Sequence, residues 1–385
     1  MSNLGLKYQT ARYSLSDAYR EYPQSLIQWK RLARQKMSEE AWGYLEGGAG
    51  FESTLKGNIE SFKKWKIRPR YLRNVGERDL SITLMGRKQA TPFILAPIGV
   101  MSIIHSEAEI GAAKAAGNFG IPFVLSTVSS HTIEEVATEA PLTEKWFQLY
   151  PGKDMELVKS MIRRAEKSGY TTLVVTVDTT MLGWRERDLK NEYLPFLKGE
   201  GIANYLSDEV FLSGLDKLPD QDMMGAIMKF LSVYVNPEFS WDDLSEILKF
   251  TKLPVVLKGI THPEDVEMGI DAGVKGIVIS NHGGRQVDGA ISTIDALSII
   301  TDKKKVGVDL MLDSGIRHAA DAMKAISLGA KAVLIGRPYA YALAAGGQRG
   351  VEAYLNQITS EMDLQLGLSG FNSPSQLSRD SIIKM

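Results

Sequence analysis

The sequence contains no cysteine among its 385 residues. This absence excludes disulfide bonds, thiolate metal sites, cysteine nucleophiles and C-terminal prenylation. Long apolar runs are also missing, since no stretch approaches the ~20 residues that cross a bilayer, and residues 1–7 (MSNLGLK) do not resemble a secretory signal. We therefore expect a cytoplasmic protein that has no membrane contact and needs no metal ion.

An excess of charge of one sign is lacking too. The 45 Lys and Arg residues are balanced by 46 Asp and Glu residues, which argues against nucleic acid or another polyanion as the partner. A small ligand fits this balance better. The composition, 44% hydrophobic and 24% charged, is that of a globular chain long enough for one large barrel or two medium domains.

Eight short apolar runs alternate with helix-like segments from residue 90 onward, which predicts eight β-strands, each followed by a helix. The runs are Phe93–Ala96, Pro122–Leu125, Trp146–Leu149, Thr172–Thr176, Val255–Leu257, Gly276–Ile279, Leu310–Leu312 and Ala332–Ile335. The clearest helical segments are Glu107–Phe119, the segment after the capping residue Thr132, Asp154–Lys167, and His318–Leu328, which stops at Gly329. Eight such units predict an α/β protein with a (β/α)8 TIM barrel.

A doubly wound open sheet is the alternative fold for alternating strands and helices. That fold usually carries a glycine fingerprint in its first strand-to-helix turn and an acidic residue about 20 residues later. Pro97-Ile98-Gly99, which follows the first run, has no such fingerprint. The pattern therefore favours the barrel.

Two parts of the chain lie outside the eightfold repeat. Residues 1–75 are predicted to form a helical extension that caps one barrel mouth, with helices over Ser25–Met37 and Glu39–Leu45, and residues 76–385 to form the barrel. Residues 186–240 form a long insertion after the fourth strand, of a length typical of a lid or binding loop. Within it, a stripe at near-helical spacing is predicted to pack on the barrel, with contact to a membrane or a partner as the alternative: Met223, Met224, Ile227, Met228 and Leu231.

A glycine-rich loop follows the sixth apolar run and carries two chemically useful side chains. It reads Ser280-Asn281-His282-Gly283-Gly284-Arg285. His282 can accept a proton near neutral pH, and Arg285 can bind a carboxylate through two parallel hydrogen bonds. The alternative is an ordinary glycine turn with two exposed polar residues, but the other loops speak against it.

In a barrel of this kind, catalytic and binding residues gather on the loops that follow the strands. Asp313-Ser314-Gly315-Ile316-Arg317 and Gly336-Arg337 follow the last two strands and together are suited to bind a phosphate. Lys258 follows the fifth strand and could stabilise negative charge on a bound ring. Polar residues at or just beyond four other strand ends could bind the edge of a heterocycle: Ser126, Gln148, Thr176 and Ser280.

A second set of strand-end residues is suited to a small organic acid. Tyr150, Asp178, Arg185, His282 and Arg285 form this set. Two arginines with one histidine indicate carboxylate chemistry, and Asp178 would favour the imidazolium that forms when His282 takes up a proton. The other histidines, His105, His131, His262 and His318, are expected to cap helices or face solvent.

These residues stand in motifs that resemble the FMN-dependent L-2-hydroxy acid oxidising family, the group of glycolate oxidase, lactate oxidase and lactate monooxygenase. The resemblance covers nearly the whole chain. It rests on residues 44–49 (YLEGGA), 96–99 (APIG), 147–150 (FQLY), 176–179 (TVDT), 257–259 (LKG), 280–285 (SNHGGR), 313–317 (DSGIR) and 335–338 (IGRP), in the family's order.

The resemblance implies a role for each site residue. FMN would be bound by Pro97, Ile98, Gly99, Ser126, Gln148, Thr176, Lys258, Ser280, Asp313, Ser314, Gly315, Arg317, Gly336 and Arg337. The substrate would face Tyr44, Tyr150, Arg185, His282 and Arg285; His282, Asp178 and Tyr150 would be catalytic. Ile98 stands where several family members have threonine, so a side-chain bond to the flavin from this position is not expected.

The resemblance also implies the reaction. A small L-2-hydroxy acid, with L-lactate favoured, would be oxidised and O2 would be the acceptor, in a homo-oligomer of four or eight subunits. Residues 183–188, 195–199, 204–205 and 337–340 resemble lactate 2-monooxygenase, which releases acetate, CO2 and water. Four alternatives stay open: a lactate oxidase that releases pyruvate and H2O2, an acceptor-linked L-lactate dehydrogenase, an FMN-binding metabolite sensor, and a phosphate-binding isomerase or synthase without flavin.

Overall fold

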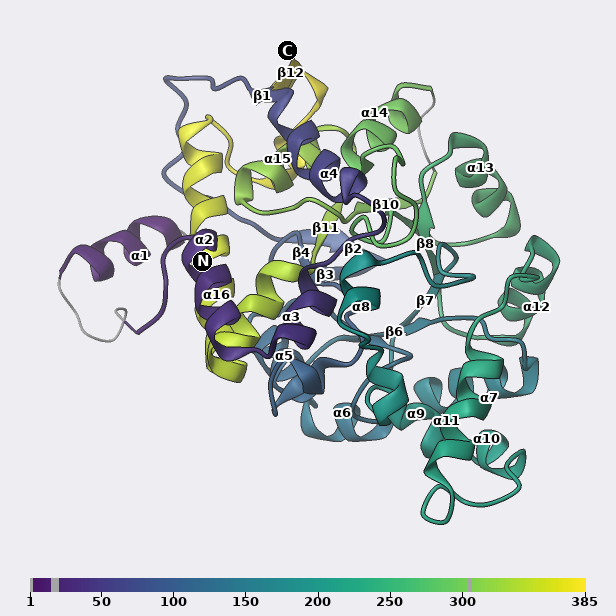
Figure 1. Ribbon diagram of the computed structural model, residues 1–385. Coiled ribbons are helices and arrows are strands. Elements are labelled where there is room, and N and C mark those ends of the chain that lie inside the picture. Colours follow the sequence, from purple (N-terminus) through teal and green to yellow (C-terminus); the bar gives the residue numbers. More distant parts are fainter. Residues whose placement is uncertain (1–2, 15–20, 304–306) are drawn as a thin grey trace.

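Eight parallel strands form a closed barrel at the centre of the molecule (Figure 1). The computed structural model describes residues 3–14, 21–303 and 307–385. The barrel strands are β4 (Phe93–Leu95), β5 (Phe123–Ser126), β6 (Lys145–Leu149), β7 (Thr172–Thr176), β8 (Val255–Ile260), β9 (Gly276–Ile279), β10 (Asp309–Leu312) and β11 (Ala332–Ile335). Pairing of β11 with β4, with Val333 opposite Phe93, closes the ring. The predicted TIM barrel is confirmed.

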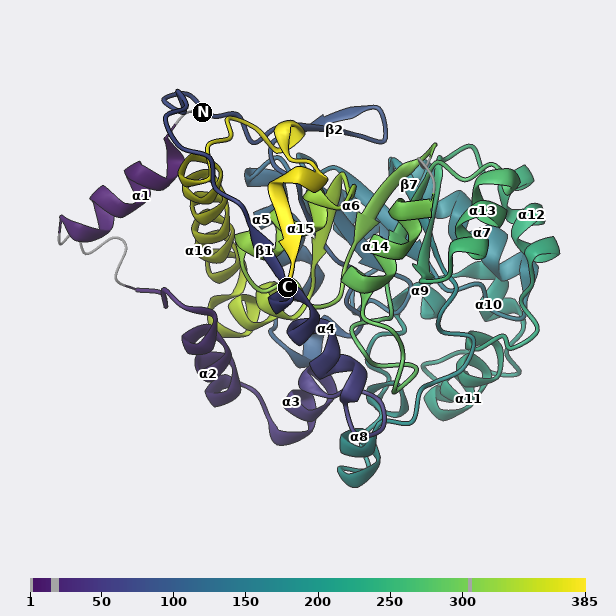
Figure 2. The ribbon, with the colours of Figure 1, turned by 90° about the horizontal axis from the view of Figure 1, so that it is seen from above.

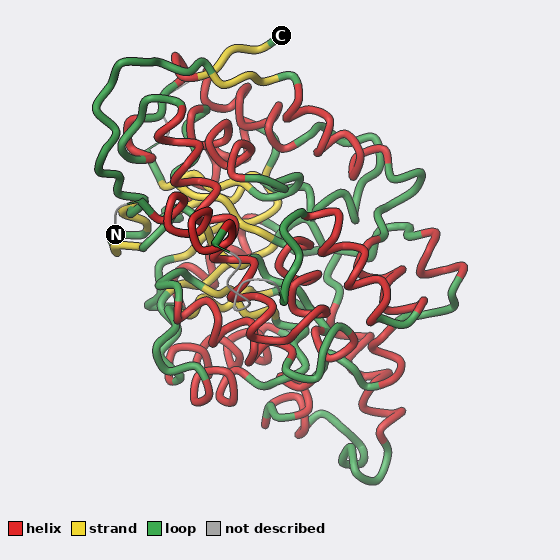
Figure 3. The backbone as a smooth tube through the Cα atoms, turned by 90° about the vertical axis from the view of Figure 1, so that its left-hand side faces the viewer, coloured by secondary structure: helices red, strands yellow, loops and turns green. Residues whose placement is uncertain are grey.

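A helix follows each barrel strand and lies outside it, as Figure 3 shows in red around yellow. These helices are α5 (Ala108–Asn118), α6 (Ile133–Glu139), α7 (Met155–Lys167), α12 (Trp241–Phe250), α13 (Pro263–Ala272), α14 (Thr293–Lys303), α15 (Ala319–Ser327) and α16 (Arg337–Leu368). Thr132 caps α6 in a capping box with Glu135, as its sequence predicts. Among the described residues, no helix combines the length and the apolar character that crossing a membrane requires.

The strands separate two apolar cores because successive side chains point to opposite faces. Alternate strand residues fill the barrel interior, among them Ile94, Val124, Trp146, Val174, Val256, Val278, Met311 and Leu334. The residues between them pack outward against the helices. Leu84, from a hairpin of β2 (Ile82–Leu84) and β3 (Arg87–Gln89), joins the interior core. Figure 2 shows this hairpin at the end of the barrel opposite to α3 (Glu39–Glu46) and α8 (Glu186–Lys190).

The N-terminal segment forms α1 (Leu4–Tyr13), α2 (Leu26–Lys36), α3 (Glu39–Glu46) and α4 (Ser53–Lys63). The predicted helices correspond to α2 and α3, whereas α1 and α4 were not anticipated from the sequence. A strand, β1 (Trp65–Ile67), then pairs antiparallel with β12 (Ile382–Lys384). The segment that precedes the barrel therefore contacts the C-terminal residues that follow it. Short 3-10 turns lie at Met101–Ile103, Pro374–Gln376 and Arg379–Ser381.

The insertion after β7 consists of short helices that are linked to the barrel by hydrogen bonds and an ion pair. They are α8 (Glu186–Lys190), a 3-10 turn (Pro195–Lys198), α9 (Ala203–Leu206), α10 (Glu209–Ser213) and α11 (Met223–Tyr234). Arg164 of α7 forms an ion pair with the buried Asp208 and donates to the Asn204 carbonyl. The Asn204 amide donates in turn to the Thr127 carbonyl beyond β5. The insertion is therefore tied to two barrel units by buried polar contacts.

The prediction that a methionine-rich stripe of α11 packs on the barrel is wrong for its methionines. Met223, Met224 and Met228 are 43%, 58% and 56% exposed, whereas only Ile227 of the stripe is fully buried. The buried face of α11 is Ala226, Ile227, Phe230, Val233 and Tyr234. Helical spacing identifies residues that share a face, but here two apolar faces compete and the aromatic one packs inward.

Candidate active site

The loop after β9 carries His282 in a left-handed backbone conformation. His282, Gly283 and Gly284 have φ values of 58°, 65° and 75°. Positive φ is costly for a residue with a side chain, and such positions cluster at functional sites. The His282 amide donates to Ser280 Oγ and the Gly283 amide to Ser314 Oγ, at 3.1 and 2.9 Å, so the turn is held by its own first residue and by the loop after β10.

Asp178, just beyond β7, holds the imidazole of His282. His282 Nδ1 lies 2.7 Å from Asp178 Oδ1 and 3.1 Å from Thr179 Oγ1. Burial lowers the pKa of His282, and the Asp178 charge opposes this only in part. The ring is therefore neutral near pH 7, with Nδ1–H donating to Asp178 and the Nε2 lone pair available as a proton acceptor.

Tyr150 faces the free nitrogen of that ring. Its hydroxyl lies 3.4 Å from His282 Nε2, and its ring makes an edge contact with Tyr234 of α11 at 5.5 Å between centroids. Burial raises the pKa of Tyr150, with the Asp178 charge adding to the effect. Tyr150 thus stays protonated and can donate a hydrogen bond to an oxygen bound beside His282.

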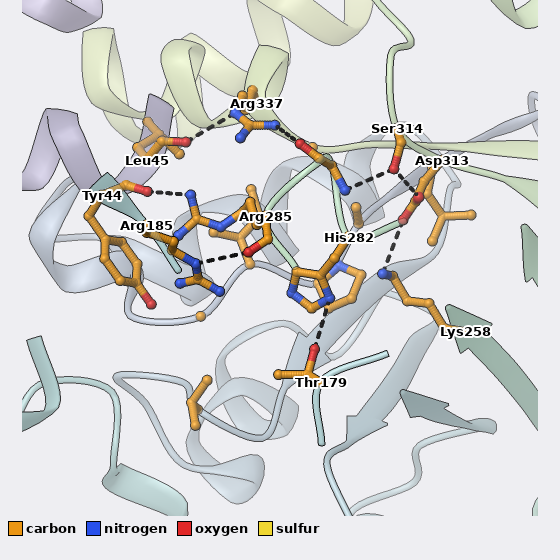
Figure 4. Close-up of a pocket in the computed structure, with 18 of the residues that line it drawn as sticks. Tyr44, Leu45, Thr179, Arg185, Lys258, His282, Arg285, Asp313, Ser314 and Arg337 are labelled. Carbon is orange, nitrogen blue, oxygen red and sulfur yellow. Dashed lines mark hydrogen bonds and ion pairs between the residues drawn. The ribbon is translucent and has the colours of Figure 1, made fainter. Parts of the chain in front are cut away.

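Arg185 and Arg285 lie side by side next to His282, as Figure 4 shows. Arg285 donates from Nη1 to the carbonyls of Tyr44 and Gly47 at 2.6 and 2.8 Å, and its guanidinium lies over the Tyr44 ring. Arg185 donates from Nε to the Arg285 carbonyl at 3.2 Å. Backbone carbonyls therefore hold part of each guanidinium, and Arg185 Nη2 also donates to Gln286 Oε1 at 3.1 Å. An anion can then bind to Nη1 of Arg185 and to the guanidinium edge of Arg285 that does not face Tyr44 and Gly47.

The two arginines carry positive charge that their surroundings do not cancel. Burial and the neighbouring Arg185 lower the pKa of Arg285 to about 9. In the described part of the chain, the carboxylate that pairs with Arg185 is that of Asp188, 3.9 Å from its Nη1. Arg185 is buried and Arg285 half-buried, so a bound anion would relieve the repulsion between them, and a planar carboxylate matches the guanidinium fork.

Lys258 lies on the other side of His282, within β8 and not after it as the sequence indicates. Its Nζ is 3.2 Å from Asp313 Oδ2 and 3.1 Å from Ser280 Oγ. Burial opposes its charge, but Asp313 and Asp178 outweigh that effect and raise the pKa of Lys258. A permanent positive charge therefore stands at the carboxyl end of β8.

Two buried polar atoms at neighbouring strand ends have no hydrogen-bond partner among the described residues: Gln148 Nε2 and Thr176 Oγ1. Gln148 Oε1 is used, since it accepts from Ser126 Oγ at 3.1 Å. Buried polar groups are rarely left unpaired, and at a functional site they commonly await a ligand. With Lys258 nearby, an unpaired N–H and hydroxyl fit the polar edge of a flavin ring.

The loops after β10 and β11, which are predicted to bind phosphate, form one end of the pocket with their backbone atoms. Gly315 has a φ of 100° and passes against Asn58 of α4, which lies where a side chain would be. Gly336 precedes α16 and has open space where its side chain would be, so an anion can approach the N-terminus of this helix. Arg317 lines the same end. Arg337 also lines it, but its side chain donates to the carbonyls of Leu45, Gly47 and Gly283.

One pocket joins these groups at the mouth of the barrel. Of the predicted residues it is lined by Tyr44, Pro97, Ile98, Gly99, Tyr150, Arg185, Lys258, His282, Arg285, Asp313, Ser314, Gly315, Arg317, Gly336 and Arg337. Ser126, Gln148, Thr176, Asp178 and Ser280 stand behind this lining. Sequence reasoning missed further lining residues, among them Leu45, Val128, Thr179, Leu182, Phe196 and Tyr234.

The other histidines lie apart from this pocket. His105 and His262 accept a backbone N–H through Nδ1 near the starts of α5 and α13, and His318 precedes α15. His131 contacts the buried Glu109, which raises its pKa. Among the described residues, no group of three His, Asp or Glu side chains is arranged to hold a metal ion.

Comparison with known proteins gives a consistent result. Residues 33–384 match the family model of the FMN-dependent dehydrogenases. The chain is 40% identical to the L-lactate oxidase of Lysinibacillus sphaericus over 94% of this chain and 93% of the relative, and 35% identical to human 2-hydroxyacid oxidase 2 over 93% and 97%. A soluble mutant of the membrane-associated (S)-mandelate dehydrogenase from Pseudomonas putida has the same fold, with a TM-score of 0.84, 34% identity, and 94% and 100% coverage.

Proposed function

We propose, from the premise that this chain belongs to the FMN-dependent dehydrogenase family, that it oxidises L-lactate with O2 in the manner of a lactate 2-monooxygenase. Oxidation of a 2-hydroxy acid with FMN as cofactor follows from the family. The choice of L-lactate and the fate of the product are the proposed part.

The observation that carries the proposal is the convergence of one base and two guanidinium groups on one pocket. His282 Nε2, the Tyr150 hydroxyl and the free edges of Arg185 and Arg285 line the same space. A carboxylate bound to the arginines would place the hydroxyl of a 2-hydroxy acid next to His282 and Tyr150. Such positioning supplies much of the rate enhancement that an enzyme achieves.

Each side chain then has a definite task. His282 Nε2 accepts the proton of the substrate hydroxyl, and Asp178 stabilises the imidazolium that results. Tyr150 donates a hydrogen bond to the same oxygen as it becomes a carbonyl oxygen. FMN, when bound, supplies the acceptor for the α-hydrogen and its two electrons. Lys258, charged and buried beside the unpaired groups of Gln148 and Thr176, offsets negative charge at that end of the pocket.

Apolar side chains in the pocket lining favour a substrate whose side chain is small and apolar. Phe196 and Tyr234 of the insertion and Leu182 of the β7 loop line the pocket. Phe196 and Tyr234 pack against one another with 5.6 Å between ring centroids, and both are buried. A methyl group such as that of L-lactate fits next to this wall without leaving a polar group unpaired.

The polar contacts that hold the insertion on the barrel support the monooxygenase reaction, in which acetate is the product. The wall of the insertion is held to the barrel by Arg164, Asp208 and Asn204, so pyruvate would leave slowly. Pyruvate that meets H2O2 before either escapes gives acetate, CO2 and water. The 40% identical relative named L-lactate oxidase favours the alternative, in which pyruvate and H2O2 are released.

One experiment tests both levels of the proposal. Purified holoenzyme is mixed with L-lactate in air, and pyruvate, acetate and H2O2 are measured. Acetate equal to the lactate consumed supports the monooxygenase, whereas pyruvate and H2O2 in equal amounts identify an oxidase. Turnover of glycolate or mandelate in preference to L-lactate would contradict the proposed substrate. We also propose a homo-oligomer, which light scattering of the purified protein tests.

A further inference from the structure

Gln286, the residue after Arg285, forms four hydrogen bonds to the loop that follows β7. Its Oε1 accepts from the Gly183 amide at 3.2 Å and from Arg185 Nη2 at 3.1 Å. Its Nε2 donates to the carbonyls of Asp178 and Met181 at 2.9 and 2.8 Å. A primary amide has two donors and two lone pairs, so every hydrogen-bonding position of this side chain is used.

This amide joins the two loops that carry the base and the arginines, beside the contacts of His282 with Asp178 and of Arg185 with the Arg285 carbonyl. The loop after β7 contributes Asp178 and Arg185, and the loop after β9 contributes His282 and Arg285. The two loops touch closely at Gly183, where a side chain would lie 2.4 Å from the Arg285 carbonyl oxygen. A tight contact without side chains cannot orient Arg185, whereas a directed hydrogen bond can.

The hydrogen bonds of Arg185 show what Gln286 controls. Nε donates to the Arg285 carbonyl and Nη2 donates to Gln286 Oε1. A guanidinium group is planar, so two fixed nitrogens fix the plane of the whole group, including Nη1. Arg185 is also buried, with 8% exposure, so water does not replace a lost partner easily.

We propose that Gln286 is a positioning residue that sets the plane of Arg185 and thereby the affinity of the site for the substrate carboxylate. The inference rests on the carboxylate site of the proposed function, but not on L-lactate as the substrate. Gln286 contacts the backbone carbonyl of Asp178 and not its carboxylate, so we expect the pKa of His282 to stay the same when Gln286 is replaced.

A double-mutant cycle on the holoenzyme tests this inference with oxalate, a carboxylate that cannot be oxidised as a 2-hydroxy acid. Oxalate binding is measured by calorimetry for wild type, Gln286→Met, Arg185→Met and the double variant. We expect Gln286→Met to raise the Kd about 10-fold, the scale of a weakened charge-assisted hydrogen bond. The double variant should bind oxalate within about twofold of Arg185→Met, because coupled residues are not additive.

A matched control distinguishes positioning from general stability. Gln357 of α16 also bridges two segments, accepting from Trp29 Nε1 and donating to the Gln24 carbonyl, but it lies outside the pocket lining. Gln357→Met should lower the Tm and leave the Kd for oxalate unchanged. The acid limb of the pH profile of kcat/KM should stay in place in Gln286→Met.

Two results would overturn the inference: an unchanged Kd in Gln286→Met, or additive effects in the double variant. If Arg185→Met itself leaves the Kd unchanged, the proposed carboxylate site is wrong, which is a separate failure. If Gln286→Met does not fold, Gln286→Glu replaces it. Its carboxylate would bind Arg185, so it should weaken oxalate binding but not the binding of lactamide, a neutral amide; equal effects on both ligands contradict the inference.

Discussion

Asp178 holds His282 through a single carboxylate oxygen: Oδ1 lies 2.7 Å from His282 Nδ1, whereas Oδ2 is buried and has no hydrogen-bond partner among the described residues. Burial opposes ionisation of Asp178, but His282 and Lys258 outweigh that effect and lower its pKa. The carboxylate therefore stays charged at neutral pH, and its charge acts on the imidazole. Two predictions depend on this pair.

The first concerns His282 as the base. His282→Gln should retain FMN but slow reduction of the flavin by L-lactate about 100-fold or more, the usual effect of losing a general base. Anaerobic stopped-flow absorbance measures this rate. His262→Gln, a change at an exposed helix cap on α13, serves as the control and should reduce at the wild-type rate. Fast reduction in His282→Gln would show that another group takes the proton.

The second concerns the pH dependence of the same step. The base must be neutral, so kcat/KM falls as the pH drops through the pKa of His282. The Asp178 charge raises that pKa against the effect of burial. Asp178→Asn removes the charge, so the acid limb should move to lower pH while the maximal rate falls, because the imidazolium is less stable. A profile from pH 5 to 9 measures both, and a shift to higher pH contradicts the assignment.

A third prediction concerns the hold on the carboxylate. Arg285→Lys keeps the charge but loses the planar fork, as does Arg185→Lys, so each should raise KM for L-lactate about 10-fold. Steady-state kinetics at low lactate checks this. Arg31→Lys, an exposed change on α2, is the control. Unchanged KM in both pocket variants would exclude the carboxylate site.

A fourth prediction tests the fate of the product at Gly99. A methyl group there would lie 2.6 Å from Val128 Cγ2 and 3.0 Å from the Val128 carbonyl oxygen. Because Val128 also lines the pocket, Gly99→Ala must displace this wall or the Pro97–Gly99 loop. Wild type should yield mainly acetate, and Gly99→Ala should shift the products toward pyruvate and H2O2.

The companion variant for Gly99 removes the crowding. Gly99→Ala combined with Val128→Ala removes the closer of the two contacts, that with Val128 Cγ2, and leaves the carbonyl oxygen at 3.0 Å, so it should return the products partly toward acetate. Product analysis in air separates the cases. Stoichiometric H2O2 from the wild type would identify a lactate oxidase and make the monooxygenase proposal wrong.

A fifth prediction concerns the N-terminal segment. Asn58 of α4 and Asn281, next to His282, exchange two amide hydrogen bonds of 2.8 Å in a buried contact. Asn58→Ala also removes the acceptor of the Thr293 amide, so it should lower the free energy of unfolding by about 1–3 kcal/mol. Urea denaturation measures this. The double variant with Asn281→Ala should cost less than the sum of the single changes.

The eight strands were predictable because strands of a parallel barrel are buried on both faces and read as short apolar runs. Three of the eight match to the residue, and β8 differs most, since it extends to Ile260. The motifs of the family could also be identified from the sequence, because the residues that approach a cofactor or substrate lie at or just after the strand ends.

The sequence by itself therefore determined the barrel, the order of its loops and the chemical types gathered at its mouth. Only the tertiary structure decided which distant residues meet. The pairing of β1 with β12, the contact of Asn58 with Asn281 and the contribution of Phe196 and Tyr234 to the pocket join residues far apart in the chain. Local periodicity records which residues share a face, but the partner of that face is chosen by packing of the whole chain, as the exposed methionines of α11 and the four hydrogen bonds of Gln286 demonstrate.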